Sequence, residues 1–215
     1  MNFNLLHEFV LGFMVALLVI AIAVIIERFI YYSYIERSRK RLMRFLAAGD
    51  EQAVFKAAQG TSCPHARLIG GMLALKGLEK DAFESKVQAL YLTQQAGVKR
   101  MLWMIDTTIT LSPLLGLLGT ILGIIDTFNA LASQGVSDPQ AVSQGIGTAL
   151  FATAAGIGIA VVCLVFHNYF NERVERINEQ LKVMALDQAG AIANESAEVR
   201  GGREPTRIKP QAAAA

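Results

Sequence analysis

Three stretches of the chain are long and apolar enough to cross a membrane as helices. The first covers residues 9–26, the second residues 107–125, and the third has its apolar core at residues 145–166; none of them contains Lys, Arg, Asp or Glu. A membrane-spanning helix needs about 20 mostly apolar residues, so each stretch is sufficient. The pattern predicts an all-α integral membrane protein with three transmembrane helices.

The first stretch is expected to be retained as a membrane anchor. No basic segment precedes it and no small-x-small cleavage site follows it, so a signal peptide is the weaker interpretation. Glu27, Arg28 and three tyrosines come next, which suits the interfacial end of a transmembrane helix. The tyrosines are Tyr31, Tyr32 and Tyr34.

The remaining segments are predicted to be helical and to extend from the membrane into a cytoplasmic helical bundle. Residues 79–95 carry apolar side chains at helical spacing. A short polar turn at residues 132–139 joins the second and third spans, with Pro139 placed to open the third helix. After the third span a mixed-charge helix is expected to end near Gly190, because glycine favours helix C-termini.

This pattern divides the chain into five parts. We expect a first transmembrane helix at residues 1–30 and a cytoplasmic helical segment at residues 31–104. A transmembrane hairpin of the second and third helices follows at residues 105–171, then a cytoplasmic helical extension at residues 172–191. Residues 192–215, with two glycines, two prolines and a run of alanines, are predicted to be disordered.

The distribution of charge predicts how the chain is oriented. All 20 Lys and Arg fall at residues 28–100 or 173–209, and none lies between Met101 and Asn171. Basic residues therefore follow the first span and the third span, whereas the turn between the second and third spans has none. Because basic residues favour the cytoplasmic side, the N-terminus is expected outside and the C-terminus in the cytoplasm.

Composition excludes several classes of protein. Charged residues make up 18% and apolar residues 53% of the chain, with a mean hydropathy of +0.39, whereas a soluble domain is about a quarter charged. The absence of Lys and Arg from the central region also argues against a nucleic-acid-binding protein. No nucleophile elbow or phosphate-binding loop is present, so an enzyme is not expected. Cys63 and His65 alone make a weak metal site, and neither a metal nor another cofactor is expected.

Small and weakly polar residues gather on one face of the second span and one face of the third. At about 100° per residue, the small face of the second span falls within a sector of about 120°, opposite Leu114, Leu117, Leu118, Ile121, Leu122 and Ile125. Such faces favour close helix packing, and the alternative is a narrow, weakly polar lining. The members of the small face on the second span are Ser112, Pro113, Gly116, Gly119, Thr120, Gly123 and Thr127, and those of the third-span stripe are Gly145, Ala149, Ala152, Gly156 and Ala160, flanked by Thr148 and Thr153.

Two acids lie near the ends of the second span. An acid within the membrane is a functional candidate, but Asp106 and Asp126 both sit close enough to the interface for simple exposure. Asp126 is the better candidate, because weakly polar residues continue beyond it, and it is placed to face a vestibule on the outer side.

At these residues the chain resembles the MotA/TolQ/ExbB proton-channel family. Residues 111–125, LSPLLGLLGTILGII, together with Phe128 are similar to the second span of ExbB and TolQ proteins. Residues 145–156, GIGTALFATAAG, resemble the third-span motif. Three spans also suit ExbB and TolQ better than MotA, which has four. The chain is identified as a member of this family, with an ExbB-like subunit favoured.

The resemblance implies a function that spacing alone does not show. ExbB-like subunits form homo-oligomers, expected here to be pentamers, in the bacterial inner membrane. They surround an ExbD/TolR-like partner whose single span carries an aspartate, and use the proton motive force to energise a TonB/TolA-like protein and outer-membrane transport. By matching position, Thr120 and Thr153 would face that aspartate. Thr148 stands where some relatives have a glutamate, so the partner is the expected proton carrier.

Other functions stay open at this point. A TolQ-like subunit for envelope maintenance and a motor relative for gliding or secretion share the same pattern. A non-conducting membrane scaffold, whose small faces only pack helices, is the alternative from another class.

Overall fold

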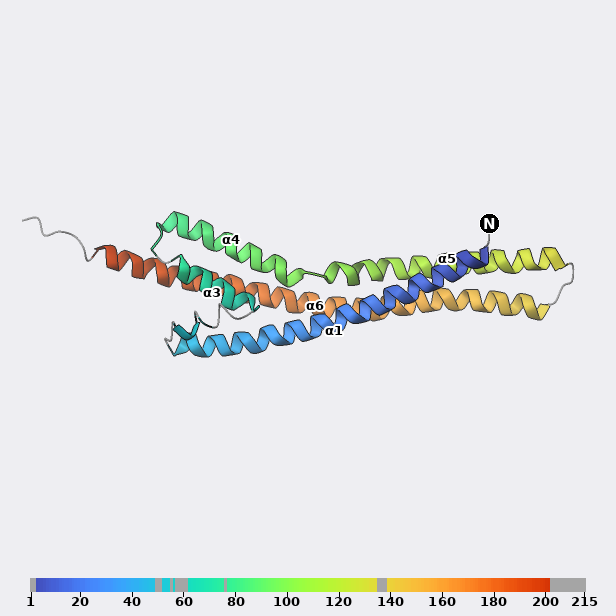
Figure 1. The fold of residues 1–215 in the computed structure, drawn as a ribbon, viewed down its shortest axis with the longest axis horizontal. Helices are drawn as coiled ribbons and strands as arrows, with labels where there is room; N and C mark the ends of the chain where they lie inside the picture. The colour runs from blue at the N-terminus through green and yellow to red at the C-terminus, as the bar shows by residue number, and fades with distance from the viewer. Residues whose placement is uncertain are drawn as a thin grey trace, which may run out of the picture. The chain divides into compact units, whose positions relative to one another are not determined.

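The computed structural model describes residues 3–48, 52–54, 56, 62–75, 77–134 and 139–201, and within these residues the regular secondary structure is α-helical. Among the described residues, the helices with defined bounds follow one another along the chain (Figure 1). They are α1 at Phe3–Ala47, α3 at Pro64–Ala74, α4 at Lys80–Lys99, α5 at Leu102–Gln134 and α6 at Pro139–Gly201.

Three of these helices are long and apolar enough to cross a membrane. By length and composition the candidate spans lie within Leu6–Leu46 of α1, Leu102–Ala132 of α5 and Val142–Asp187 of α6. The prediction of an all-α membrane protein with three transmembrane helices is therefore confirmed. Each helix also continues well beyond the apolar stretch that identified it.

Local sequence explains where several helices begin. Pro64 opens α3 and Pro139 opens α6, as expected for a residue whose missing N–H would be unpaired in the first turn anyway. Met101 separates α4 from α5 with a φ of 67°, a left-handed conformation that cannot continue an α-helix. Pro113 lies inside α5 without ending it, a placement tolerated in transmembrane helices whose neighbours satisfy the freed carbonyl.

The predicted helix end near Gly190 is wrong. Helix α6 continues through Gly190 to Gly201, so residues 192–201 are helical rather than disordered. Glycine inside a helix costs only about 1 kcal/mol relative to alanine, and it ends a helix reliably only in the left-handed conformation, which Gly190 does not adopt. The rest of the expected tail, residues 202–215, lies outside the described residues, as does the centre of the turn at residues 135–138.

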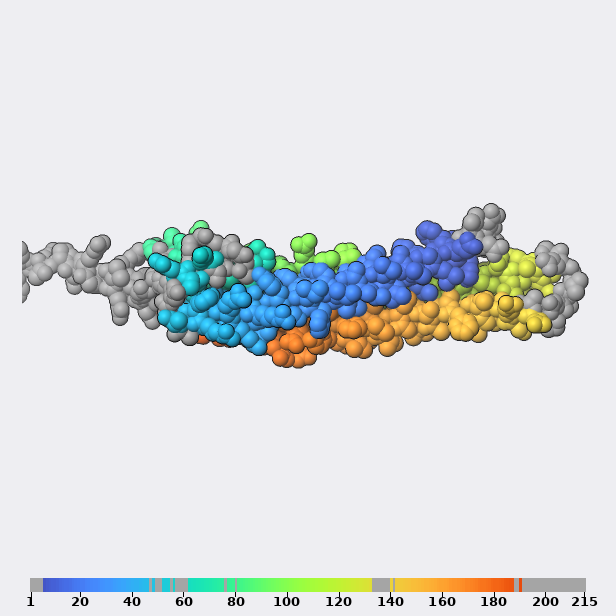
Figure 2. Space-filling view, turned by 60° about the horizontal axis from the view of Figure 1, so that its bottom comes forward, coloured from blue at the N-terminus to red at the C-terminus, as the bar shows by residue number. Residues whose placement is uncertain are grey.

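The chain divides into two compact units, each considered by itself. The first comprises Met1–Tyr34 and Lys99–Arg176, and it contains the α5–α6 hairpin and the first part of α1. Helix α1 lies along α6 here (Figure 1 and Figure 2), where the Tyr32 and Phe170 rings meet with centroids 5.6 Å apart. Buried apolar side chains line the contacts between its helices, among them Val10, Met14, Ala21, Val24, Leu122, Ala149, Ala152 and Ala160.

The second unit comprises Ile35–Val98 and Ile177–Ala215. Its apolar core joins the end of α1 to α3 and α6, and is formed by Leu42, Val54, Cys63, Ala66, Ile69 and Met184. Helix α4 adds the buried side chains of Phe83 and Val87, and Leu90 reaches the backbone of Gly71 on α3. The amphipathic pattern predicted for residues 79–95 is therefore present on α4, with Tyr91 at the edge of the buried face.

Candidate functional site

The small faces of α5 and α6 are in direct contact. A β-carbon added to Gly116 would lie 2.8 Å from the carbonyl oxygen of Ala152, and one added to Gly119 would lie 3.1 Å from the β-carbon of Ala152. One added to Gly123 would lie 2.9 Å from the β-carbon of Ala149. Real β-carbons essentially never approach closer than 3.0 Å, so glycine permits this backbone separation.

Glycines on α6 make the reverse contacts. A β-carbon on Gly156 would collide with the carbonyl oxygen of Ser112 and lie 3.2 Å from the α-carbon of Gly116. A β-carbon on Gly145 would collide with the side chain of Thr127. The packing interpretation of both small faces is thus supported from the Gly145–Thr127 contact to the Gly156–Ser112 contact.

Helix α1 covers the same face of α5 from another direction. The Cγ1 atom of Val10 lies 3.8 Å from the position of a β-carbon on Gly119, and Nε2 of His7 lies 3.7 Å from that on Gly123. Gly119 and Gly123 therefore lie between α6 and α1 of the same chain, whereas Gly116 meets α6 alone. Pro113, at the start of this face, is half-buried.

Two threonines form a polar pair inside this apolar contact. The hydroxyls of Thr120 on α5 and Thr153 on α6 are hydrogen-bonded to each other. The Thr120 Oγ1 also lies 3.0 Å from the Gly116 carbonyl oxygen and 3.1 Å from that of Ala149, and the Thr153 Oγ1 lies 3.0 Å from the Gly116 oxygen. Each hydroxyl has one hydrogen to donate and two lone pairs, so the pair can redistribute its hydrogens among these acceptors without moving the backbone.

The other candidate residues lie apart from this pair. Thr148 is exposed, and its hydroxyl donates to the Gly145 carbonyl of its own helix over 2.8 Å. Asp126 is half-buried on α5. Next to it, the Thr127 hydroxyl donates to the Gly123 carbonyl over 2.7 Å. The structure thus brings Thr120 and Thr153 together and leaves Thr148 on the surface of the first unit.

A buried arginine was not singled out by the sequence. Only 4% of Arg28 is exposed, and its guanidinium pairs with Glu27, lies 4.6 Å from the centre of the Tyr31 ring and approaches the Met101 sulfur to 3.8 Å. Tyr32, expected in an interfacial belt, is also buried. The signal for this cluster was the placement of aromatic side chains three and four residues after an arginine on one helix face.

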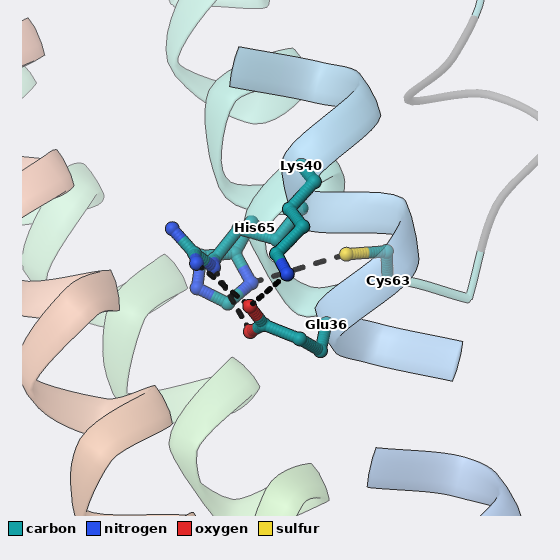
Figure 3. A network of polar contacts seen from close by, with 5 residues as sticks. Glu36, Lys40, Cys63 and His65 are labelled. Atoms are coloured by element: carbon teal, nitrogen blue, oxygen red, sulfur yellow. Dashed lines mark hydrogen bonds and ion pairs between the residues drawn. The ribbon is translucent and has the colours of Figure 1, made fainter. Parts of the chain in front are cut away.

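Figure 3 shows a polar network in the second unit, with Glu36 and Lys40 on α1 and with Cys63 and His65 at the start of α3. Glu36 accepts a hydrogen bond from Arg39 at 2.9 Å and pairs with Lys40 at 3.6 Å. The Cys63 sulfur lies 3.9 Å from Nδ1 of His65.

His65 in this network is fully buried. Burial, with the nearby Arg39 charge, lowers the pKa of His65 to about 4, and burial raises the pKa of the Cys63 thiol. The imidazole is in its neutral, metal-binding form, but a protonated thiol beside a guanidinium makes a poor metal ligand. Among the described residues no group of three or more His, Cys, Asp or Glu is placed to hold a metal ion. We interpret His65 as a buried structural residue.

Taken with its apolar helices, the hairpin defines a class of protein: a multi-span membrane protein whose glycine-packed helices enclose hydroxyl groups. Residues 48–183 match the MotA/TolQ/ExbB proton channel family, and this chain belongs to that family. The resemblance found in residues 111–125 and 145–156 is thereby confirmed. Members of the family are channel subunits rather than enzymes, and the chain is a bacterial inner-membrane protein.

Individual relatives carry ExbB names. A Synechocystis protein named ExbB-like 3 is 33% identical over 157 residues, which cover 70% of this chain and 75% of that protein. The biopolymer transport protein ExbB of Aquifex aeolicus is 29% identical over 109 residues, covering 51% of this chain and 68% of its own. The protein exbB1 of Vibrio cholerae is 50% identical over 52 residues, covering 24% of this chain and 23% of its own.

Proposed function

We propose that this chain forms the stationary wall of a proton-driven transport complex, working with a single-span, ExbD/TolR-like partner that carries an intramembrane aspartate. The observation that carries the proposal is the hydroxyl pair of Thr120 and Thr153, two hydrogen-bonding groups held at the contact between two otherwise apolar helices. The ExbB names of the relatives support the same assignment. The task of such a complex is to energise a TonB/TolA-like protein and, through it, outer-membrane transport.

The hydroxyl pair suits a carrier that changes charge. A carboxylate accepts hydrogen bonds, and a protonated carboxyl group also donates one; a threonine hydroxyl can meet either form. A lysine or arginine would instead hold the charged form in place, and none lies between Met101 and Asn171. Each proton that crosses supplies about 2.3 kcal/mol per 100 mV of membrane potential, which the complex would turn into movement of the partner.

The other candidate positions take supporting roles in this proposal. Pro113, Gly116, Gly119, Gly123, Gly145, Ala149, Ala152 and Gly156 set the spacing of the hairpin and keep its wall smooth. Thr148 lies on the exposed face of α6, where a neighbouring subunit or the partner can reach it. Asp126 would face an outer vestibule.

The proposed assembly is a homo-oligomer, a pentamer by analogy with the family. The N-terminus lies outside, and residues 31–104 and 172–191 form the cytoplasmic part, in line with the distribution of Lys and Arg. Residues 105–171 form the proton-channel domain.

A non-conducting scaffold is the second candidate, and one observation favours it. Gly116, Gly119 and Gly123 all meet α6 of the same chain, and Gly119 and Gly123 also meet α1, so helix packing alone can account for these glycines. TolQ-like envelope maintenance and a gliding or secretion motor share the wall mechanism and differ in the partner.

Two measurements test the proposal. Native mass spectrometry after co-expression with candidate single-span partners should show a ring that retains the partner. In proteoliposomes, the pair of substitutions Thr120→Val and Thr153→Val should lower partner-dependent proton flux by tenfold or more while the ring persists. Thr107→Val is the matched control, because that hydroxyl only donates to the Trp103 carbonyl of its own helix. A ring without a partner, or flux unchanged in the double variant, would favour the scaffold.

A further inference from the structure

His7 stands on the face of α1 that meets the hairpin. It lies one and two turns before Val10 and Met14, which are 3% and 5% exposed, so the three residues share one face of the helix. The His7 Nε2 atom lies 3.7 Å from the position of a β-carbon on Gly123. That nitrogen is buried and has no hydrogen-bond partner among the described residues.

An unpaired polar atom in such a place requires an explanation. Leaving a buried donor or acceptor unpaired costs about 1–3 kcal/mol, and such atoms in native proteins often mark a functional role or a bound water. Val10 and Met14 show that an apolar side chain would fit the same face of α1 at no such cost. The imidazole at position 7 therefore indicates a role other than packing.

The Thr120–Thr153 pair is connected to this nitrogen through Gly123 and Ala149. Gly123 follows Thr120 by three residues, or about 4.5 Å of helix rise. The β-carbon position on Gly123 that faces His7 also lies 2.9 Å from the Ala149 β-carbon, and the Ala149 carbonyl is bonded to the Thr120 hydroxyl. His7 and the hydroxyl pair thus lie along one contact line, with His7 nearer the turn that joins α5 and α6.

The charged groups of this region are acidic. On α1 the neighbour of His7 is Glu8, which is exposed, and on α5 the nearest titratable side chain toward the turn is Asp126, which is half-buried. Residues 139–171 of α6 carry no Lys, Arg, Asp or Glu. No lysine or arginine of residues 101–171 therefore faces His7.

We propose that His7 takes up protons at the outer end of the hairpin and passes them toward the Thr120–Thr153 pair, a role that rests on the proposed function. The Nε2 lone pair accepts a proton from a hydronium ion, so that an N–H bond forms and an O–H bond of the hydronium ion breaks. That N–H bond then breaks as the proton moves to water at the hydroxyl pair and on to the carboxylate of the partner. Histidine suits this task because its charge ordinarily changes between pH 5 and 8.

The first part of the test follows the protonation of His7 directly. The chain has three histidines, so His65→Gln and His167→Gln together leave His7 as the single imidazole. We would label its nitrogens with 15N in the full-length protein, reconstitute it in vesicles, and titrate each side of the membrane separately by NMR. The expected result is an imidazolium signal that follows the outer pH alone. A signal that follows the inner pH, or shows no titration between pH 5 and 8, overturns the proposal.

The second part measures proton flux in vesicles containing the protein and its partner. Wild-type flux should rise as the outer pH falls from 8 to 5, and His7→Gln should lose that dependence and at least tenfold of the flux at low outer pH. Glu8→Gln changes the exposed neighbour of His7 and should keep both the flux and its dependence on the outer pH. His7→Asn is the second variant if His7→Gln does not fold. A variant with the same pH dependence as wild type refutes the role of His7, whereas absence of flux in wild type refutes the proposed function.

Discussion

The hydroxyl of Thr120 on α5 is hydrogen-bonded to the hydroxyl of Thr153 on α6, thirty-three residues apart in the chain. Both hydroxyls lie near the same carbonyl oxygen, that of Gly116. Because Gly116 has no side chain, the backbones come close enough for this shared acceptor. The polar pair and the glycine packing are therefore parts of one arrangement, and disturbing either should disturb the other.

The two threonines should be energetically coupled. In a double-mutant cycle for unfolding, Thr120→Val and Thr153→Val should deviate from additivity by about 0.5–1.5 kcal/mol, because each hydroxyl removed takes a bond from the other. Reversible unfolding in mixed micelles provides the four free energies. Thr107→Val combined with Thr153→Val is the control and should be additive. Additive effects in the first cycle would show that the hydroxyls do not interact.

Alanine substitutions at two glycines of α6, two residues apart, should have different effects on the free energy of unfolding. Gly156→Ala places a β-carbon against the Ser112 carbonyl and should lower the free energy of unfolding by about 1–3 kcal/mol, the usual range for overpacking. Gly158→Ala meets nothing within 4 Å and should be neutral or raise it by up to about 1 kcal/mol, from helix propensity. Thermal unfolding in detergent, followed by circular dichroism, measures both. Equal destabilisation by both substitutions would contradict the close approach at Gly156.

Position 101, between α4 and α5, has a left-handed backbone conformation and should accept only certain residue types without a loss of stability. Met101 has a φ of 67°, which costs about 1–2 kcal/mol for most residues. Met101→Val should lower the free energy of unfolding by more than about 1 kcal/mol, because a β-branched side chain is the most strained there. Met101→Asn should cost less, since asparagine adopts this conformation readily. Met104→Val, inside α5, provides the comparison, and a Met101→Val variant as stable as Met101→Asn would argue against a left-handed joint.

Acid should destabilise the second unit through His65. The folded pKa of about 4 lies below the ordinary value of 6.5, so between those values the unfolded chain binds more protons than the folded one. The stabilising contribution is therefore present above pH 6.5 and is lost as the pH falls to 4, about 3 kcal/mol in all. The midpoint of chemical unfolding at a series of pH values measures this loss.

His65→Gln is the variant that isolates this effect. It should show a shallower dependence of stability on pH in the same interval, while His167→Gln, which lies in the first unit, should keep the wild-type slope. Parallel curves for wild type and His65→Gln would mean that His65 is not buried in its neutral form.

The length of the apolar stretches predicted the helical class and the number of spans, and the residue type of Pro139 predicted the start of α6. Helical periodicity predicted the apolar face of α4. It also predicted which faces of α5 and α6 are small, because spacing along one helix determines which side chains share a face. The spacing of residues along one helix cannot predict contacts between segments that are far apart in the chain. His7 is a polar residue near the end of an apolar stretch, and nothing local distinguishes the burial of its Nε2 atom from exposure at an interface. Leu122, expected among the apolar residues opposite the small face, is nevertheless only 5% exposed.

The pairing of Thr120 with Thr153 depends on the register of two helices joined by a turn, which the sequence of neither helix specifies. The end of α6 was missed for a related reason. Glycine is common at helix C-termini, so Gly190 was a reasonable candidate. Whether it adopts the left-handed conformation that ends a helix depends on the contacts that the following residues can make.

The absence of Lys, Arg, Asp and Glu from residues 9–26, 107–125 and 145–166 has a consequence for voltage sensing. The membrane potential does work only on charges that move through it. The side chains of these segments contribute no gating charge, so voltage exerts no direct force on them whichever way the helices shift. Any electrical energy that the complex captures must be delivered through the proton and the group that holds it. On this chain the groups at the edges of these stretches, such as a protonated His7 and the carboxylate of Asp126, are the places where the subunit itself would feel the field.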